Sequence, residues 1–323
     1  TDQKIFEEGS VVRARMIESR KKYKELHIII FSKRKFSKSR LEENVWICST
    51  ESFSEWLYPF DAIRLGRAII KERKITEITC QDPFLTAMVA VSLKKRFNLQ
   101  LEIQIHTDIG SSYFWQESWL NKIRFLIAQF LLSRADKIRV VSSRIKNYLV
   151  SNLVIAKAKI YIKPIFVDVE KIKNTLVTVD LHKKYPQFNK IILMASRLTR
   201  EKNIDLAIKA MSTILKTLPK AGLLIVGTGP EEQKLKLKAK SYKLEANVVF
   251  EDWVNQETLY SYYKTADLFL VTSLYEGYGM TLVEAHAAGC KIVSTDVGVA
   301  REIEARIVGQ DYHGVARAIA ESL

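Results

Sequence analysis

Hydrophobic positions along the chain alternate between short β-branched runs and longer stretches with helical spacing. In the first half, the apolar runs predict strands and the spaced apolar positions predict helices. The predicted strands are 26–32, 75–80, 101–105 and 137–141. The predicted helices are 10–24, 60–73, 85–97 and a long amphipathic helix within 116–134. This alternation indicates a parallel sheet with crossover helices.

The pattern loosens over 161–188, which we interpret as a linker, and then restarts. The later predicted strands are 190–194, 222–226, 248–250, 268–271 and 291–294. The later predicted helices are 205–217, 230–242, 256–265, 281–288 and 313–323. We therefore expect an α/β protein with two facing, doubly wound Rossmann-like domains, 1–168 and 169–323. Ligands of such sheets bind at the carboxyl ends of the strands, so we expect a cleft between the domains.

The two ends of the chain do not fit this scheme. A Rossmann-like domain opens with a buried strand, but residues 1–9 are polar and have the pattern of a loop. The last residue falls inside the predicted helix 313–323. We expect that the first strand of domain 1–168 and the closing part of domain 169–323 lie outside this sequence.

Length and composition support a two-domain protein. The chain has 323 residues, of which 47% are hydrophobic, and this length favours two cores of about 150 residues each. Cys48, Cys80 and Cys290 match no metal or disulfide spacing, which is typical of a reducing compartment. No apolar run approaches the roughly 20 residues of a membrane span. We expect a cytoplasmic protein, with a peripheral position on the cytoplasmic face of the membrane as the alternative.

Positive charge is concentrated in the first domain. Residues 1–168 contain 30 Lys+Arg and 18 Asp+Glu, a net charge of +12, whereas residues 169–323 contain 21 and 18, a net charge of +3. Such an excess indicates an anionic partner: a nucleic acid, an anionic membrane surface or a phosphorylated substrate. A lysine-rich solvated surface would give the same count.

The segment Glu276-Gly-Tyr-Gly-Met-Thr-Leu-Val-Glu284 follows a predicted strand and opens a helix. Glycines there let the backbone approach a ligand, and free N–H groups at a helix start can bind phosphate. The two carboxylates can accept hydrogen bonds from the hydroxyls of a sugar or ribose. As a bare pattern, the two glutamates are more often surface charges, one of them favoured by the helix dipole.

Two further loops follow strands in the same domain. Ser196-Arg-Leu-Thr-Arg-Glu-Lys202 places Arg197 and Lys202 where they can neutralise a diphosphate. Gly227 and Gly229 form a Gly-x-Gly turn that lacks the third glycine of a dinucleotide fingerprint. Because the loops lie at the same ends of parallel strands, we expect them to form one site.

The order of these segments resembles the retaining glycosyltransferases of the GT-B fold, in particular glycosyltransferase family 4. The resemblance covers residues 186–303, through SRLTREK, VGTGP, EDWV and EGYGMTLVE; His106 and the segment Ser142-Ser-Arg match more loosely. The chain departs from the family pattern at Ser196, Lys291, Ile165-Phe166, Val299 and Arg301.

The resemblance implies roles for individual residues. Arg197 and Lys202 would contact the donor diphosphate and stabilise the leaving group, with Glu276 on the donor sugar and Glu284 on the ribose. His106 would approach the reacting carbon. The remaining donor-binding positions that the resemblance implies are Gly9, Gly227, Gly229, Trp253, Val254, Gly277, Tyr278, Gly279, Met280 and Thr281.

The implied reaction is metal-independent transfer of a hexosyl unit from a UDP-sugar or GDP-sugar to a lipid-linked or glycan hydroxyl, with retention and without a cofactor. No Asp-x-Asp triplet occurs, which disfavours the metal-bridged GT-A alternative. The aromatic and basic stretch 113–139 favours an anionic membrane surface as a partner. A non-catalytic GT-B relative and a sugar-nucleotide epimerase are the alternatives. A nucleic-acid-binding protein would explain the charge but not the converging loops, so we expect no nucleic-acid partner.

Overall fold

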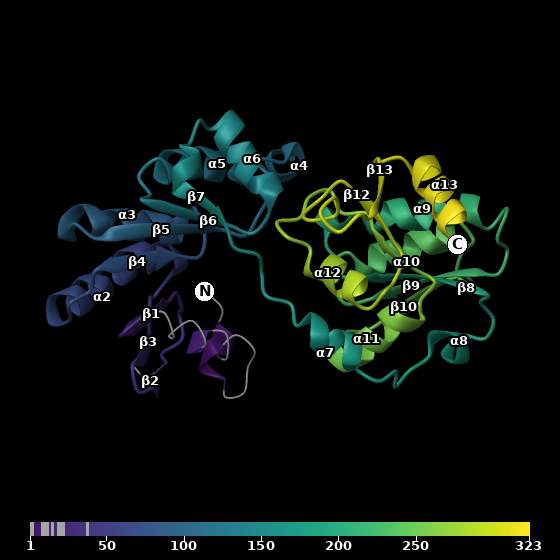
Figure 1. The fold of residues 1–323 in the computed structure, drawn as a ribbon, viewed down its shortest axis with the longest axis horizontal. Coiled ribbons are helices and arrows are strands. Elements are labelled where there is room, and N and C mark those ends of the chain that lie inside the picture. The colour runs from purple at the N-terminus through teal and green to yellow at the C-terminus, as the bar shows by residue number, and fades with distance from the viewer. Residues whose placement is uncertain (1–2, 8–12, 14–15, 18–22, 37–38) are drawn as a thin grey trace. The chain divides into compact units, whose positions relative to one another are not determined.

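The computed structural model describes residues 3–7, 13, 16–17, 23–36 and 39–323, whose fold is drawn in Figure 1. The chain divides into two compact units. The first consists of Thr1–Ile105, Ile123–Arg139 and Ile155–Tyr161, and the second of His106–Lys122, Val140–Val154 and Ile162–Leu323. The predicted helix 10–24 lies mostly outside the described residues, and the domain boundary between 168 and 169 stays a prediction.

The strands of the first half form two sheets. The order of the first sheet is β1 (Leu26–Ile30), β3 (Val45–Ser49) and β2 (Ser39–Glu42), with β1 parallel and β2 antiparallel to β3. The order of the second sheet is β4 (Glu77–Cys80), β5 (Gln100–Ile105), β6 (Lys137–Val140) and β7 (Ile160–Ile162). The α/β class is confirmed, but the hairpin β2–β3 and the division into two sheets were not predicted, because the short polar β2 carries no strand pattern.

Two predicted helices of the first half agree with α2 (Tyr58–Glu72) and α3 (Leu85–Phe97). The predicted helix within 116–134 is confirmed as α5 (Trp119–Leu132), and a short helix that was not predicted, α4 (Ser112–Glu117), precedes it. Ser118 between them is extended, with φ −156° and ψ 154°, and its Oγ accepts a hydrogen bond from the Asn121 amide at 3.2 Å. A serine in this position satisfies an amide of the next helix and so favours a new helix start.

All six strands of the second half form one parallel sheet. In spatial order they are β10 (Val248–Glu251), β9 (Ala221–Val226), β8 (Lys190–Ala195), β11 (Leu268–Val271), β12 (Ile292–Thr295) and β13 (Arg306–Val308). Register pairs Lys190 with Ala221 and Phe269 with Ile292. The sequence analysis missed only β13.

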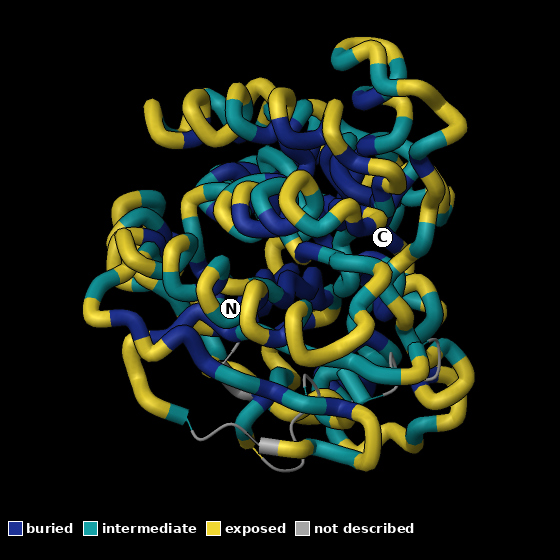
Figure 2. Tube along the Cα trace, turned by 90° about the vertical axis from the view of Figure 1, so that its left-hand side faces the viewer, coloured by how far each residue is buried: buried dark blue, intermediate teal, exposed yellow. Residues whose placement is uncertain are grey.

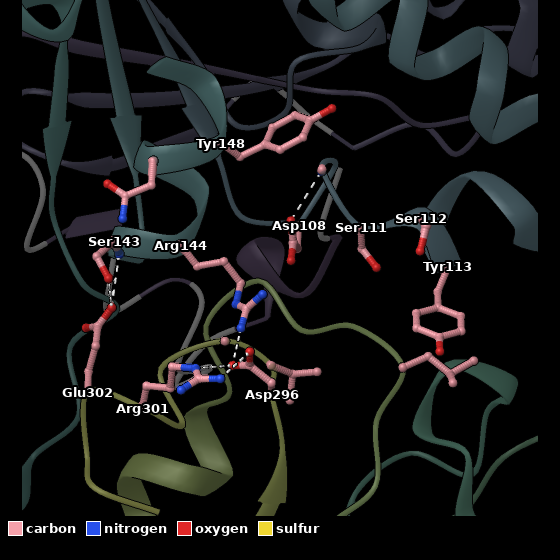
Figure 3. Close-up of a pocket in the computed structure, with 15 residues that line it drawn as sticks. Asp108, Ser111, Ser112, Tyr113, Ser143, Arg144, Tyr148, Asp296, Arg301 and Glu302 are labelled. Atoms are coloured by element: carbon pink, nitrogen blue, oxygen red, sulfur yellow. Dashed lines mark hydrogen bonds and ion pairs between the residues drawn. The ribbon is translucent and has the colours of Figure 1, made fainter. Parts of the chain in front are cut away.

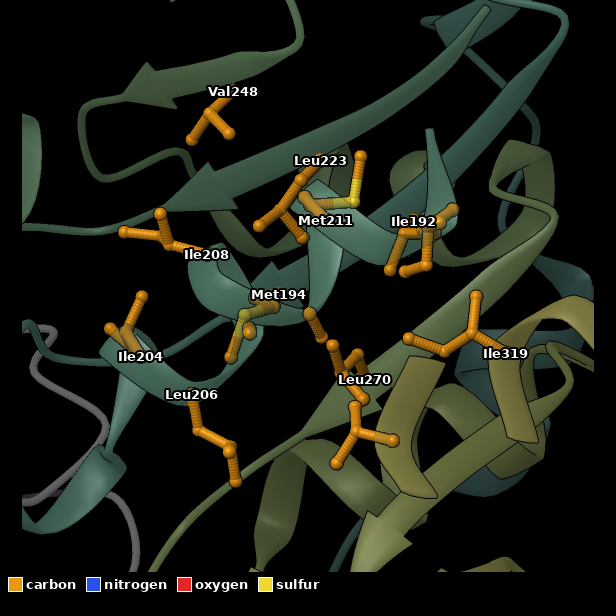
Figure 4. Close-up of a cluster of buried hydrophobic side chains, with 14 of the residues drawn as sticks. Ile192, Met194, Ile204, Leu206, Ile208, Met211, Leu223, Val248, Leu270 and Ile319 are labelled. Atoms are coloured by element: carbon orange, nitrogen blue, oxygen red, sulfur yellow. The ribbon is translucent and has the colours of Figure 1, made fainter. Parts of the chain in front are cut away.

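Alternate residues of these strands enter two apolar clusters, one on each face of the sheet. One face packs against α9 (Ile204–Ile214), α10 (Glu232–Ser241) and α13 (Tyr312–Ser322), as Figure 4 shows around Ile192, Leu223 and Leu270. The other face packs against α7 (Val169–Asn174), α8 (Leu181–Lys184), α11 (Gln256–Thr265) and α12 (Met280–Ala287). Each fully buried Leu or Ile contributes about 1.5–3 kcal/mol, so these clusters are the main source of stability of this sheet.

The strand order of this sheet fixes where a ligand would bind. The order β10-β9-β8-β11-β12-β13 is that of a dinucleotide-binding domain, in which the winding reverses beside the first strand. Here that reversal falls between β8 and β11, and ligands of such sheets bind outside the carboxyl ends of the strands at this point. Buried residues, among them all of Ala221–Val226 and Leu268–Val271, are dark blue in Figure 2. Within the described part of the chain, every helix is too short or too polar to cross a membrane.

Candidate functional site

Two loops meet at the reversal of the sheet, one after β8 and one after β11. The Thr272 hydroxyl donates to the carbonyl oxygens of Lys202 and Asn203, both at 3.0 Å. The Leu274 amide donates to the carbonyl oxygen of Glu201 at 2.8 Å. These bonds hold the 196–203 loop against the 272–276 loop, and so they position the side chains that both loops carry.

Lys202 and Glu276 form an ion pair across these loops. The distance between Lys202 Nζ and Glu276 Oε1 is 2.5 Å, and the two side chains are only 15% and 18% exposed. The Ser273 hydroxyl donates to the same carboxylate oxygen at 2.8 Å. The structure therefore brings together two residues that the sequence placed 74 positions apart.

Arg197 and Glu284 lie in contrasting surroundings. The Arg197 side chain is 72% exposed, and its Nη2 lies 3.3 Å from Glu201 Oε1. Glu284, on the first turns of α12, is buried, and the Tyr263 hydroxyl donates to its Oε2 at 3.4 Å. Burial and the neighbouring Glu284 carboxylate raise the pKa of Tyr263 well above its usual value.

The Gly227 turn rests on the 196–203 loop. A Cβ atom at Gly227 would lie 2.0 Å from the Ser196 carbonyl oxygen, and its φ of +134° is also unfavourable for other residues. The same Cβ would be 3.5 Å from Trp253 Cε3, so the indole lies beside the turn. Gly229 approaches the Leu198 backbone as closely, and Val254 follows Trp253 in the loop after β10. These four predicted positions are thus assembled around the same strand ends.

His106 lies directly after β5, in a segment that belongs to the second unit. A Cβ at Gly277 would lie 1.7 Å from the His106 carbonyl oxygen, so only glycine allows this contact. The Ser142 hydroxyl donates to the Gly277 carbonyl oxygen at 3.1 Å. The structure therefore brings the His106 backbone to the Glu276 loop, and the role of its side chain stays a prediction.

The remaining predicted positions lie at the start of α12. Tyr278 and Gly279 precede the helix, and Met280 and Thr281 are its first residues. The Tyr278 carbonyl oxygen accepts a hydrogen bond from the Val299 amide at 2.9 Å. No side-chain cap bonds to this helix start within the described chain. Gly9 lies outside the described residues.

Two family models match consecutive parts of the chain. The model of glycosyltransferase family 4 matches residues 22–171, and the model of glycosyl transferases group 1 matches residues 181–315. The chain belongs to the GT-B glycosyltransferases. An alpha-monoglucosyldiacylglycerol synthase of Streptococcus pneumoniae is 32% identical over 105 residues, 32% of this chain and 24% of that protein. The chain spans between 15% and 29% of the length of four curated relatives that match it.

Solved structures agree with this fold. Sucrose-phosphate synthase from Thermosynechococcus elongatus has a TM-score of 0.78 at 20% identity, over 96% of this chain and 83% of that one. The Anabaena protein HepE, solved in complex with UDP, has a TM-score of 0.71 at 16% identity, over 92% of this chain and 89% of that one. The predicted GT-B fold is therefore confirmed.

This glycosyltransferase also contains a polar pocket that the sequence analysis missed. Its volume is about 580 Å³, and all its lining residues belong to the second unit. Arg144 and Arg301 both bond to Asp296, with Arg301 Nε 2.9 Å from Asp296 Oδ1 (Figure 3). The signal in the sequence was the departure at Arg301 from the family pattern, but nothing in the sequence linked it to Arg144.

The pKa values of two carboxyl groups in this pocket are shifted in opposite directions. Hydrogen bonds from Arg301, together with Arg144, hold the pKa of Asp296 below its ordinary value. Burial raises the pKa of Asp108 above its ordinary value. On another wall, the Ser143 amide donates to Glu302 Oε1 at 3.1 Å and the Ser143 hydroxyl bonds to the same carboxylate. The pocket thus offers several hydrogen-bond donors and acceptors, as a sugar requires.

Proposed function

We propose that this chain transfers a hexosyl unit from a nucleoside diphosphate sugar to a hydroxyl acceptor, with retention of configuration and without a metal ion. The observation that carries the proposal is the Lys202–Glu276 pair at the reversal of the sheet, beside the start of α12. This arrangement brings a cation, a carboxylate and the start of a helix to one place. A diphosphate sugar presents the matching groups.

In the proposed mechanism, the bond between the anomeric carbon and the diphosphate oxygen breaks, and its electron pair leaves with the nucleoside diphosphate. The acceptor oxygen forms the new bond to the anomeric carbon on the same face, and its proton passes to the departing diphosphate oxygen. Lys202 has three N–H donors, so it can keep its bond to the Glu276 carboxylate and still donate a hydrogen bond to the diphosphate. Arg197, largely exposed, can turn toward the same phosphates. Fixed cations and helix dipoles of this kind stabilise the charge that develops on the leaving group.

Other predicted residues would hold the rest of the donor. Glu276 would accept hydrogen bonds from the sugar hydroxyls, and Glu284, on the next turn of the same segment, from the ribose. Trp253 beside the Gly227 turn would contact the base. The complex of HepE with UDP, a protein of the same fold, supports a nucleotide donor, and UDP is our first choice over GDP.

The acceptor would enter the polar pocket near Arg144, Asp296 and Arg301. Carboxylates and guanidinium groups in one pocket suit a polyol, since they offer both acceptors and donors. A lipid-linked or glycan hydroxyl meets this requirement. The name of the S. pneumoniae relative, a glucosyldiacylglycerol synthase, supports a lipid-linked acceptor.

A cytoplasmic protein with a peripheral membrane position fits this acceptor. Helix α5 buries Ala128, Leu131 and Leu132 but leaves Leu126 63% and Phe130 58% exposed. Apolar side chains gathered on the exposed side of a helix often mark a surface that a partner covers, and an anionic bilayer would cover this side while attracting the basic residues nearby.

The test is a donor-hydrolysis screen with UDP-, GDP- and ADP-sugars on the full-length protein. A transferase releases the nucleoside diphosphate from one of these donors, and Glu276→Ala should abolish turnover while largely preserving nucleotide binding. Nucleotide binding without turnover in the unmodified protein would favour the non-catalytic relative instead. If the product showed inversion at the anomeric carbon, the retaining mechanism would be wrong.

A further inference from the structure

The start of α2 carries a cluster of large apolar side chains in solvent. Phe53 is 95% exposed, Trp56 88% and Phe60 69%, and Leu57 beside them is 41% exposed. Single exposed apolar residues are common on protein surfaces, but a group of aromatic residues within eight positions is unusual. Such a group indicates a surface that a binding partner covers.

The folded chain holds these side chains outward. The Ser52 hydroxyl donates to Asp61 Oδ2 at 2.6 Å, which ties the loop before α2 to the first turn of the helix. Glu55, between the aromatic residues, pairs with Lys33 at 2.8 Å. On its other side α2 buries Ala62, Gly66 and Ile69. The exposed cluster is therefore part of a fixed surface.

A row of cations continues from this cluster along α2. Arg64, Arg67 and Lys71 follow Phe60 at four, seven and eleven positions, and this spacing places them on one side of a helix. Phe60 and all three cations line an open groove of about 920 Å³. We name Phe53, Trp56, Phe60, Arg64, Arg67 and Lys71 the aromatic–basic face. All of its residues belong to the first unit.

We propose that the aromatic–basic face docks on an anionic phospholipid bilayer. Aromatic side chains favour the boundary between headgroups and acyl chains, and lysine and arginine beside them are attracted to anionic headgroups. The cluster at the start of α2 would enter the boundary, and the cations would lie on the phosphates. This face belongs to the first unit and the Lys202–Glu276 pair to the second, and the face is a membrane contact additional to the exposed side of α5, so the proposal goes beyond the proposed function.

The layout of the face favours a bilayer over a nucleic acid. Single-stranded nucleic acids bind along grooves in which aromatic residues stack on successive bases while cations follow the backbone. Here the aromatic residues are grouped at one end and the cations at the other. A bilayer has this same separation, an apolar layer beside an anionic one.

The test is co-sedimentation of the purified chain with two kinds of vesicle. One is phosphatidylcholine alone, and the other also contains about 30% phosphatidylglycerol, which makes its surface strongly anionic. We compare R64Q/R67Q/K71Q with K234Q/K236Q/K240Q, which removes the same charge from α10. The first triple variant should lose about a hundredfold in partitioning, roughly fivefold per cation, and the second should bind like the unmodified chain.

A second pair of variants tests the aromatic cluster. W56S/F60S should reduce quenching of tryptophan fluorescence by brominated lipids, whereas F166S, at another exposed phenylalanine, should leave it unchanged. Circular dichroism and thermal unfolding show whether each variant is folded. Donor hydrolysis without vesicles should be the same in all folded variants, so a failed transfer proposal would not be mistaken for a failed docking proposal.

Three results would overturn the proposal. One is anionic-vesicle binding by R64Q/R67Q/K71Q that equals binding by K234Q/K236Q/K240Q. Another is a dimer in light scattering that W56S/F60S dissociates, with no binding to vesicles, because the face would then join two copies. The third is retention by single-stranded DNA without binding to anionic vesicles.

Discussion

Lys202 and Glu276 place their Nζ and Oε1 atoms 2.5 Å apart, although each belongs to a different loop of the six-stranded sheet. The loops follow β8 and β11, the two neighbouring strands at which the winding reverses. The pair therefore joins the two halves of the sheet at the place where a ligand would bind. Its contribution to stability and its proposed contribution to donor binding can be measured separately.

The first prediction concerns the stability of this pair. Lys202→Ala should lower the free energy of unfolding by about 3 kcal/mol, because it leaves the largely buried Glu276 carboxylate without its cation, although the Ser273 hydroxyl still donates to it. Urea unfolding gives the value. The double variant K202M/E276Q should lose less than the sum of the two single variants, since it leaves no uncompensated charge. Additive losses would contradict the coupling.

The second prediction concerns the contact between Gly277 and His106. Gly277→Ala should destabilise the protein by at least about 1–3 kcal/mol and reduce turnover, because the new Cβ would meet a backbone oxygen that cannot turn aside. Gly309→Ala is the control, since nothing lies within 4 Å of a Cβ there. Thermal unfolding compares the two. Equal melting temperatures would show that the two segments do not meet.

The third prediction concerns the affinity for nucleotide. Glu284→Gln should weaken UDP binding between about tenfold and a hundredfold, as expected for the loss of a hydrogen bond to a charged group. Calorimetric titration with UDP gives the affinity, with the exposed Glu245→Gln as the control. An unchanged affinity would remove Glu284 from the proposed ribose site.

The fourth prediction concerns pH. The pKa of Asp296 is lower in the folded protein than its ordinary 3.8, so its contribution to stability is present above that value and is lost as the pH falls through the lower folded pKa. The pKa of Asp108 is raised, so protonation favours the fold as the pH falls toward 3.8. Urea midpoints measured against pH should show a smaller loss of stability in acid for Asp296→Asn and a smaller gain for Asp108→Asn. The same pH profile in both variants would contradict these assignments.

Much of the second sheet could be predicted from the sequence because its strands are buried on both faces. Continuous apolar runs such as 222–226 mark such strands, and once a strand is located the position of the loop after it can be predicted as well. The meeting of Lys202 with Glu276 follows from the parallel order of the strands. The burial of Glu284 and the exposure of Arg197 do not, because both depend on packing from other elements.

The first half was harder to predict for a physical reason. Its short hairpin β2–β3 and the helix break at Ser118 depend on single hydrogen bonds and turns, which leave little hydrophobic pattern. The pocket around Asp296 joins Arg144 to Arg301, which lie 157 positions apart. No local pattern could pair them. The roles of the predicted site residues stay predictions.

The contact of Ser143 with Glu302 has a consequence for biosynthesis. Helix α6 (Ser143–Asn152) has its first amide bonded to a carboxylate 159 residues further along the chain. During translation the ribosome makes that carboxylate long after the helix has left the exit tunnel. The Ser143 amide of the nascent helix must therefore bond to water until the second sheet is almost complete, and only then can the pocket close around it.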